Sequence, residues 1–230
     1  LTASRATILP VSSFNLPETH PVAARQPFEM RPLAANYLKL SRNPLMVLVC
    51  LTAAFNFSGL FLFIAAAPAI IYDLLGLTQH PFSALFVPTV AGIMFGAYFS
   101  GRLAGRISPR RTVVIGFAVL LLAVAINIGY HAFFPPALPW SVVPVVVYAI
   151  GMALSGPSIQ LLVLDLFPRN RGLASSLQGF THTCCTALTA GVLASLLSVS
   201  GLPLALGQGT MLGLAWICWL AYQRQGLPDG

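Results

Sequence analysis

Charged residues are scarce in this 230-residue sequence, since Asp, Glu, Lys and Arg together make up only 7% of it. A soluble domain carries about 25% charged residues, because its surface must be compatible with water. Hydrophobic residues make up 57% of the chain, and its mean hydropathy is +0.84. The composition therefore excludes an ordinary water-soluble domain and predicts that lipid surrounds most of the chain.

A basic face suited to nucleic acid is also missing, although the net charge is +7. The Lys and Arg residues occupy short segments between apolar runs, without a stripe of interleaved aromatics. Four cysteines lie inside apolar runs and lack metal-ligand spacing: Cys50, Cys184, Cys185 and Cys218. We therefore predict no nucleic-acid partner, no metal and no cofactor, and interpret the cysteines as small buried hydrophobic residues.

Signatures of intramembrane catalysis are lacking as well. The segment "ALSG" around Ser155 has no glycine two positions before the serine, which a rhomboid-type protease would carry. Neither an HExxH pair nor paired carboxylates occur in the apolar runs. The sequence therefore predicts no catalytic residue and a membrane protein that is not an enzyme.

Long apolar stretches are what the sequence does contain. A membrane span needs about 20 mostly apolar residues, and lipid leaves its backbone no partners outside the segment, so each span must be helical. We interpret Pro68, Pro88, Pro144 and Pro157 as kinks or span ends. The predicted spans are 44–71, 82–101, 112–134, 140–164, 172–199 and 203–222.

The chain divides into three parts on this basis. Residues 1–42 are more polar and rich in proline, so they predict a cytoplasmic linker with a short interfacial helix near 33–40. Residues 43–224 form the predicted bundle of six transmembrane helices, and 225–230 a cytoplasmic tail. The expected fold class is an all-α membrane protein.

Basic residues between the spans fall on one predicted side of the membrane. That side receives residues 102–111, 169–171 and 224, together with the linker before the first span, because the connections alternate sides. The connections on the other side, such as "DLLGLTQH" and "HAFFPPALP", contain no Lys or Arg. Positive residues mark the cytoplasmic side, so we predict that both termini are cytoplasmic.

Three stretches resemble motifs of drug transporters in the major facilitator superfamily. "NLPETHP" (15–21) resembles the LPET signature after the sixth span of that family. "GRLAGRISPRR" (101–111) resembles the second copy of its loop motif, and "LDLFPRNRGLASSLQGF" (164–180) its connection from the tenth to the eleventh span. The run "FIAAAPAIIYDLLGLTQHPFSALF" is similar to the Bcr/CflA (bicyclomycin-resistance) group. The resemblance covers about residues 15–222.

The resemblance implies the C-terminal half of a twelve-span, proton-coupled drug exporter of the bacterial inner membrane. Such a half is a bundle of two three-helix inverted repeats that works by alternating access. Its implied partners are the lipid bilayer, protons, small lipophilic or amphipathic substrates and a missing N-terminal six-helix half. A truncated half that does not transport, or a membrane subunit that assembles with another protein, remains the alternative.

The sequence departs from the family in its loop motif and at its start. Gly105 stands where the family has aspartate, and Ser108 or Pro109 replaces the usual glycine. Residues 1–14 do not resemble the apolar sixth span that precedes the LPET signature. The departure at Gly105 weakens the expectation of a salt bridge centred on an acidic residue in this loop.

The arginine-rich loop and the carboxylate after the fourth span are candidates for a cytoplasmic gate. Gly101 is expected to let its helix end approach a neighbour closely. Asp165 pairs either locally with Arg169 or Arg171, or across the gate with Arg102 or Arg106. Alternatively, the arginines only anchor the loop to anionic lipid. The candidate gate residues are Gly101, Arg102, Arg106, Arg110, Arg111, Asp165, Arg169 and Arg171.

Polar residues recur along one face of the fifth predicted span. Spacings of three and four residues place them together on a helix: Ser175, Gln178, His182, Cys185 and Thr189. Such a stripe predicts contact with protein or a water-filled cavity, whereas Leu173, Leu177, Phe180 and Leu188 suit lipid or a neighbouring helix. Interhelical hydrogen bonding is the simpler role. The candidate substrate-cavity residues are Asn56, Phe57, Phe61, Tyr148, Gln160, Gln178 and His182.

Two titratable residues are candidates for proton coupling. Asp73 lies at the outer end of the first predicted span, and carboxylates within a membrane are functional candidates by default. His182 has a side chain that titrates near neutral pH. Both have a simpler interpretation, since Asp73 also fits a solvated position and His182 a hydrogen bond between helices.

Overall fold

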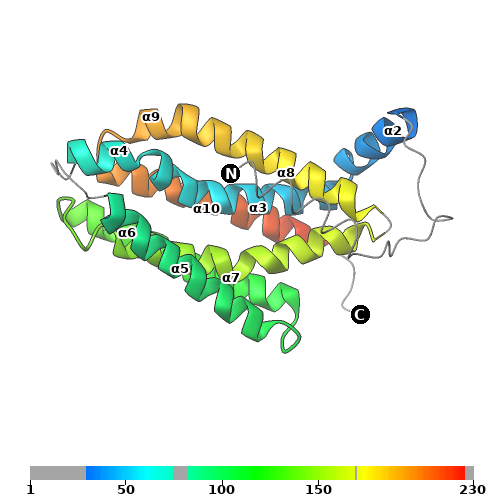
Figure 1. Cartoon of the computed structure of the whole chain (residues 1–230), viewed down its shortest axis with the longest axis horizontal. Helices are drawn as coiled ribbons and strands as arrows, with labels where there is room; N and C mark the ends of the chain where they lie inside the picture. Colours follow the sequence, from blue (N-terminus) through cyan, green and yellow to red (C-terminus); the bar gives the residue numbers. More distant parts are fainter. Residues whose placement is uncertain (1–29, 75–81, 169, 226–230) are drawn as a thin grey trace, which may run out of the picture. The chain divides into compact units, whose positions relative to one another are not determined.

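The structure, a computed structural model, describes residues 30–74, 82–168 and 170–225. Residues 37–230 form one compact unit, and the following description concerns this unit. Within the described residues all regular structure is helical. The elements in Figure 1 are α2 (Met30–Ser41), α3 (Pro44–Ala65), α4 (Ala67–Ala69), the π-helix η2 (Ile70–Leu74), α5 (Phe82–Leu103), α6 (Pro109–Phe133), α7 (Val143–Leu166), α8 (Arg171–Leu188), the π-helix η3 (Thr189–Leu193), α9 (Ala194–Leu197) and α10 (Gly201–Gln225).

Six helices in the described part of the chain are long and apolar enough to cross a membrane, which confirms the expected fold class. Two spans are segmented where single helices were expected. The first is interrupted at Ala66 before Pro68, because proline lacks the N–H that a continuous helix needs. The fifth continues from α8 into η3 and α9. In contrast, Pro88 and Pro157 lie inside α5 and α7.

Helix α6 begins three residues before the predicted span, at Pro109, because the preceding residue caps it. The Ser108 hydroxyl oxygen accepts a hydrogen bond from the Arg111 N–H at 3.4 Å, and proline suits the first helical position. The helix therefore includes Arg110 and Arg111, which the sequence analysis assigned to the loop. Helix α3 begins in the same way, with the Asn43 side chain accepting from the Met46 N–H.

The helices pair as two inverted repeats would. Helices α3, α5 and α6 make up the first repeat, and α7, α8 and α10 the second. Helix α3 packs against α10 and α8, while α7 packs against α6 and α5. The first helix of each repeat thus contacts the second and third helices of the other, as a pseudo-twofold axis requires. In Figure 1, α8 and α5 form opposite edges, with the other long helices between them.

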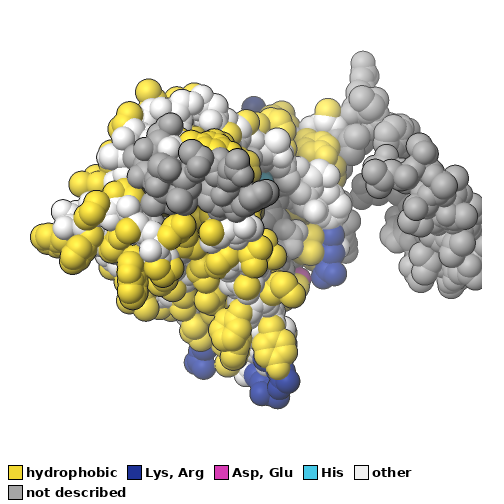
Figure 2. Space-filling model, turned by 60° about the vertical axis from the view of Figure 1, so that its left-hand side comes forward, with side chains coloured by type: hydrophobic (Ala, Val, Ile, Leu, Met, Phe, Trp, Pro, Cys, Tyr) yellow, Lys and Arg dark blue, Asp and Glu magenta, His cyan; other side chains and the backbone are white. Residues whose placement is uncertain are grey.

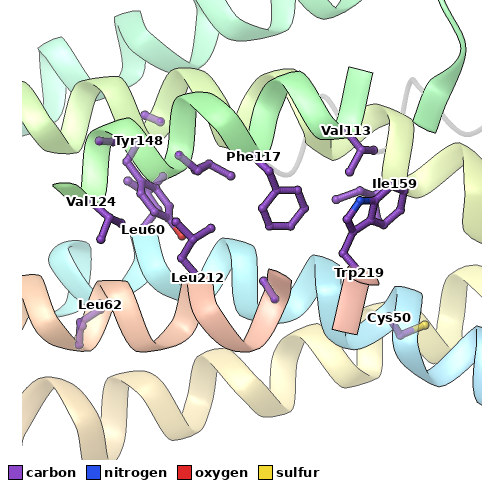
Figure 3. Packing of buried hydrophobic residues seen from close by; sticks show 14 of the residues in the cluster. Cys50, Leu60, Leu62, Val113, Phe117, Val124, Tyr148, Ile159, Leu212 and Trp219 are labelled. Carbon is purple, nitrogen blue, oxygen red and sulfur yellow. The ribbon is translucent and has the colours of Figure 1, made fainter. Parts of the chain in front are cut away.

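The hydrophobic core lies between the α3–α10 pair and the α6–α7 pair (Figure 3). The Phe117 ring meets Trp216 edge-on at 5.0 Å and stacks on Trp219 at 6.4 Å between ring centroids. Such aromatic pairs contribute about 0.5–1.5 kcal/mol beyond their buried area. Small residues bring α6 and α7 together, since Gly116 and Gly151 lie against each other's backbone.

The two edge helices present much of their surface outward. Only 11% of the apolar window of α8 is buried, compared with 56% for α3. On α5, Met94 is 68% exposed and Val87 is 65% exposed. Figure 2 shows hydrophobic side chains over the visible face, with Lys and Arg at its margins. This surface fits a bilayer or another membrane helix.

Candidate functional site

A buried hydrogen-bonded contact joins α3 to α7 near mid-span. The Asn56 side-chain N–H donates to the Ser155 hydroxyl at 3.0 Å, and the Tyr148 hydroxyl donates to the Asn56 backbone carbonyl at 3.0 Å. A Cβ atom on Gly59 would collide with the Tyr148 phenol. Asn56 and Tyr148, two of the cavity candidates, are therefore enclosed between helices.

A second buried contact joins α6, α10 and α3. The Asn127 side-chain N–H donates to the Gln208 Oε1 atom at 2.8 Å, and the Gln208 amide donates to the Gly59 carbonyl at 3.4 Å. Both amide side chains are fully buried. This pair was not predicted from the sequence, although an amide in the middle of an apolar span needs a partner and so points to one.

The polar stripe of α8 meets aromatic residues of α3. The His182 ring lies 4.3 Å from the Phe57 ring, and Phe57 stacks on Phe61 at 5.8 Å. Gln178 is 8% exposed, and its Oε1 atom has no hydrogen-bond partner among the described residues. The side of α8 that carries these residues thus faces α3.

The stripe is uneven in its exposure. Thr189 is buried and donates to the Cys185 carbonyl at 2.8 Å, Cys185 is half-buried, and Ser175 is exposed. The apolar residues of α8 divide between two environments. Leu173 and Leu177 pack against the core, whereas Phe180 is 68% exposed and Leu188 is 63% exposed.

The candidate cavity residues separate into two groups by exposure. Asn56, Tyr148 and Gln178 are buried between helices. Four others keep part of their surface accessible: Phe57, Phe61, Gln160 and His182. An aromatic surface with a few polar groups is what a lipophilic ligand needs. The accessible group is therefore the better candidate for substrate contact.

The ends of α5, α7 and α10 and the start of α6 form the arginine end of the bundle. A groove of about 1550 Å³ lies there and includes Arg106 and Asp165 in its lining. An Asp165 carboxylate oxygen lies 3.4 Å from an Arg171 guanidinium nitrogen. Of the pairings proposed for Asp165, the structure contains the local one with Arg171. Arg169 lies outside the described residues.

Two other arginines at this end rest on aromatic rings. The Arg102 guanidinium lies 5.1 Å from the centroid of Tyr98, and the Arg110 guanidinium lies 6.0 Å from that of Tyr222. Such contacts attract a guanidinium group to the face of an aromatic ring. Gly105 has a φ of +77°, a conformation that favours glycine.

Gly101 makes no close helix contact within the described part of the chain, because no described atom lies within 4 Å of the position that its Cβ would occupy. The close approaches that require glycine among the described residues include Gly59, Gly116 and Gly151, inside the bundle. Helix α5 ends two residues after Gly101.

The proton-coupling candidates differ in what the structure describes. Asp73 lies in η2, and its side chain is outside the described residues. His182 lies on α8 beside Phe57, half-buried. No group of three or more His, Cys, Asp or Glu side chains in the described ranges is arranged to hold a metal ion.

Removing the Asp165 carboxylate should have little effect on stability. Both partners of the pair with Arg171 are more than half exposed, at 52% and 59%, so solvent screens their attraction. We expect Asp165→Asn to change the free energy of unfolding by less than about 1 kcal/mol. Unfolding in denaturing detergent measures this, and Arg171→Gln should give the same result. A larger loss in both variants would show a structural role for the pair.

Comparison with known proteins decides the family. The model of the family described as Major Facilitator Superfamily matches residues 6–190. The chain belongs to the Major Facilitator Superfamily. This membership confirms the resemblance found in the motifs and the prediction of a membrane transporter in place of an enzyme.

Related members of this superfamily carry names that refer to drug resistance. The chain is 21% identical to the bicyclomycin resistance protein homolog of Haemophilus influenzae over 94% of the chain and 54% of that protein. It is 28% identical to multidrug resistance protein D of Escherichia coli over 93% of the chain and 54% of that protein. Multidrug transporter MdfA of Edwardsiella ictaluri is 25% identical over 64% of the chain and 36% of its own length. The chain thus spans about half the length of the first two relatives.

Proposed function

We propose that this chain is the C-terminal six-helix half of a proton-coupled exporter of drugs or other small amphipathic compounds. It works by alternating access in the bacterial inner membrane, with both termini in the cytoplasm. The names of the relatives support drug export, and their length, about twice the matched region, supports the assignment as a half.

The exposed side of α8 supports the proposal that a second half packs against this chain. Small residues recur at every fourth position along α8 and its continuation through η3 and α9, and all of them are exposed: Ser175, Gly179, Thr183, Ala187, Gly191 and Ser195. Small residues let the backbones of membrane helices approach closely, whereas contact with lipid has no need of them. This face is suited to a helix of the missing half.

Three of the accessible substrate candidates, Phe57, Phe61 and His182, meet at the contact between α3 and α8. His182 is close to Phe57 across the α8–α3 contact, on the same helix as the small-residue face. In alternating-access transporters the substrate site lies where two repeat bundles meet. Phe57, Phe61, Gln160 and His182 would then form one wall of the substrate path, with Gln178, Asn56 and Tyr148 holding that wall in place.

The arginine end supports the proposed orientation. Arg106, Arg110 and Arg111 lie near the α5–α6 connection, and Arg224 lies in the last turn of α10. Positive residues at one end of a bundle favour the cytoplasmic side. In this orientation the Arg-rich connection and Asp165 belong to the gate on the cytoplasmic side, and Asp73 and His182 are the candidates to carry protons.

Dye efflux tests the proposed function. We expect energised cells that make only these 230 residues to expel a lipophilic cationic dye no faster than cells with an empty vector. Cells that make the chain joined to the proposed N-terminal six-helix half should expel the dye faster. Efflux by the chain alone would contradict the assignment as a half. No efflux by the joined protein would favour a subunit or a half without transport activity.

Replacing the aromatic contact between α3 and α8 should impair transport in the joined protein. We expect Phe57→Ala and His182→Ala each to lower the dye efflux rate about tenfold, which corresponds to about 1.4 kcal/mol of lost contact. Phe180→Ala is the matched control, because Phe180 lies on the same helix but is 68% exposed. Equal losses in all three variants at equal membrane levels would contradict a substrate-facing role.

A further inference from the structure

The groove at the arginine end is built from four helices. The end of α5, the start of α6 and the second half of α7 form its walls, and Gln223 of α10 also lines it. Its volume is about 1550 Å³, and it is open to the outside. The groove is separate from the substrate candidates, none of which lines it. Its lining combines arginines with apolar side chains, and both features bear on the ligand that it can bind.

The groove contains more positive than negative side chains among its described lining residues. Among the described residues that line it, Arg106 and Arg111 are cationic and Asp165 is acidic. Asp165 pairs with Arg171, which lies outside the described lining. These two arginines therefore outnumber the carboxylate in the described lining.

The first turn of α6 adds to this positive potential. A helix N-terminus carries a partial positive charge, so cations there are unfavourable and anions favourable. Helix α6 nevertheless has Arg110 and Arg111 in its first turn and no acidic residue there. An anion bound in the groove would offset the partial positive charge of the helix N-terminus and the charge of Arg111.

The groove becomes apolar away from the arginines. The apolar part of its lining lies farther from the helix ends than the arginines do. It includes Ala97 on α5, Val114 on α6, and Leu161 and Leu162 on α7. Val114 is 40% exposed and Leu161 is 45% exposed. An anion without an apolar part would leave this wall uncovered, whereas a phospholipid presents a charged headgroup and acyl chains together.

We propose that this groove binds the headgroup phosphate of an anionic phospholipid, with its acyl chains against Val114 and Leu161. Guanidinium groups suit phosphate because their N–H groups form paired hydrogen bonds with its oxygens. Arg106 and Arg111, which line the groove together with Asp165, supply these groups. The site uses arginines that the proposed function assigns to the cytoplasmic gate, but its test measures lipid binding and does not depend on transport. A lipid bound there holds the arginine end at the surface of the membrane.

Lipid titration followed by native mass spectrometry tests the site. The chain is purified in mild detergent from the membranes of the cells that produce it, together with any partner that stays bound. It is then titrated with dioleoylphosphatidylglycerol or with dioleoylphosphatidylcholine, which has the same acyl chains but no net charge. We expect the anionic lipid to bind at least about tenfold more tightly. Equal affinity for the two lipids would overturn the proposal.

Matched arginine variants separate the groove from general attraction to anionic lipid. Arg106→Gln/Arg111→Gln should weaken binding of the anionic lipid about thirtyfold, at about fivefold for each arginine. Lys39→Gln/Arg224→Gln removes the same charge from exposed positions outside the groove and should weaken it less than about threefold. Equal losses in both variants would overturn a specific site. If the double variant does not fold, each single arginine variant should show its fivefold loss.

Two further experiments test which part of the lipid the groove recognises. Asp165→Asn removes the carboxylate that lines the groove together with the arginines, so we expect binding of the anionic lipid to tighten by up to about fivefold. Weaker binding in this variant would contradict the geometry. Glycerol 1-phosphate, which lacks acyl chains, should not displace the lipid at equal concentration. Displacement by glycerol 1-phosphate would assign the groove to a soluble phosphate and overturn the lipid site.

Discussion

Replacing Gly116 with leucine should separate α6 from α7 and destabilise the bundle by about 3 kcal/mol. A Cβ atom at this position would lie 2.6 Å from the Ser155 Cβ and 3.0 Å from the Gly151 carbonyl oxygen. Neither atom can move without its helix, because both belong to the α7 backbone or are attached directly to it. Ser155 also accepts the hydrogen bond of Asn56, so a shift of α7 disturbs its contact with α3.

Gly129→Leu is the matched control on the same helix. No described atom lies within 4 Å of the Cβ position at Gly129, so a larger side chain fits there. Its free energy of unfolding in denaturing detergent should change by less than about 1 kcal/mol. Equal destabilisation by the two leucines would show that the α6–α7 contact is less close than the structure has it.

Replacing Gln208 with leucine should destabilise the bundle by about 1–2 kcal/mol, although leucine suits lipid better than glutamine does. The reason is the Asn127 amide, which would lose its acceptor at 2.8 Å while remaining fully buried. A buried polar group that loses its partner destabilises by about 1–3 kcal/mol in proteins, and hydrogen bonds between membrane helices contribute up to about 1.7 kcal/mol.

The double variant Asn127→Leu/Gln208→Leu should recover most of that loss. Removing both amides leaves no unpaired donor, so the apolar pair is nearly neutral relative to the original. A double-mutant cycle on the free energy of unfolding measures this coupling. Additive losses would mean that the two amides do not act as a pair.

The positions of the spans could be predicted from the sequence because lipid imposes one condition, a long apolar helix. The faces of those helices were harder to predict. In α6 and α10 apolar residues surround the helix, since both lipid and the core accept them, so periodicity does not reveal the buried side. The buried amides Asn127 and Gln208 mark that side, and they were overlooked.

The side of α8 that faces protein could be predicted from the sequence, because its polar residues lie together on one side of the helix. The spacing of Gln178 and His182 predicted a face toward protein, and the structure places that face beside α3. The division of its apolar residues was not predictable, because Leu177 and Phe180 suit core and lipid equally well. Which of them is buried depends on how α3 is placed, and α3 is far away in the sequence.

The burial of Asn56 and Tyr148 between helices could not be predicted from the sequence either. A lone amide beside several phenylalanines is consistent with a ligand site or with a helix contact, and sequence spacing does not distinguish them. The structure does, because Ser155 and Tyr148 approach Asn56 from α7. The substrate candidates that remain accessible are those at the α3–α8 edge and Gln160.

The size of the native product in its own membranes tests most directly whether this chain is half of an exporter. An immunoblot with an antibody against residues 20–42 measures it without altering the protein. We expect a band near twice the 24.4 kDa of this sequence. A band near 24.4 kDa would contradict it and would assign the small-residue face of α8 to a separate partner.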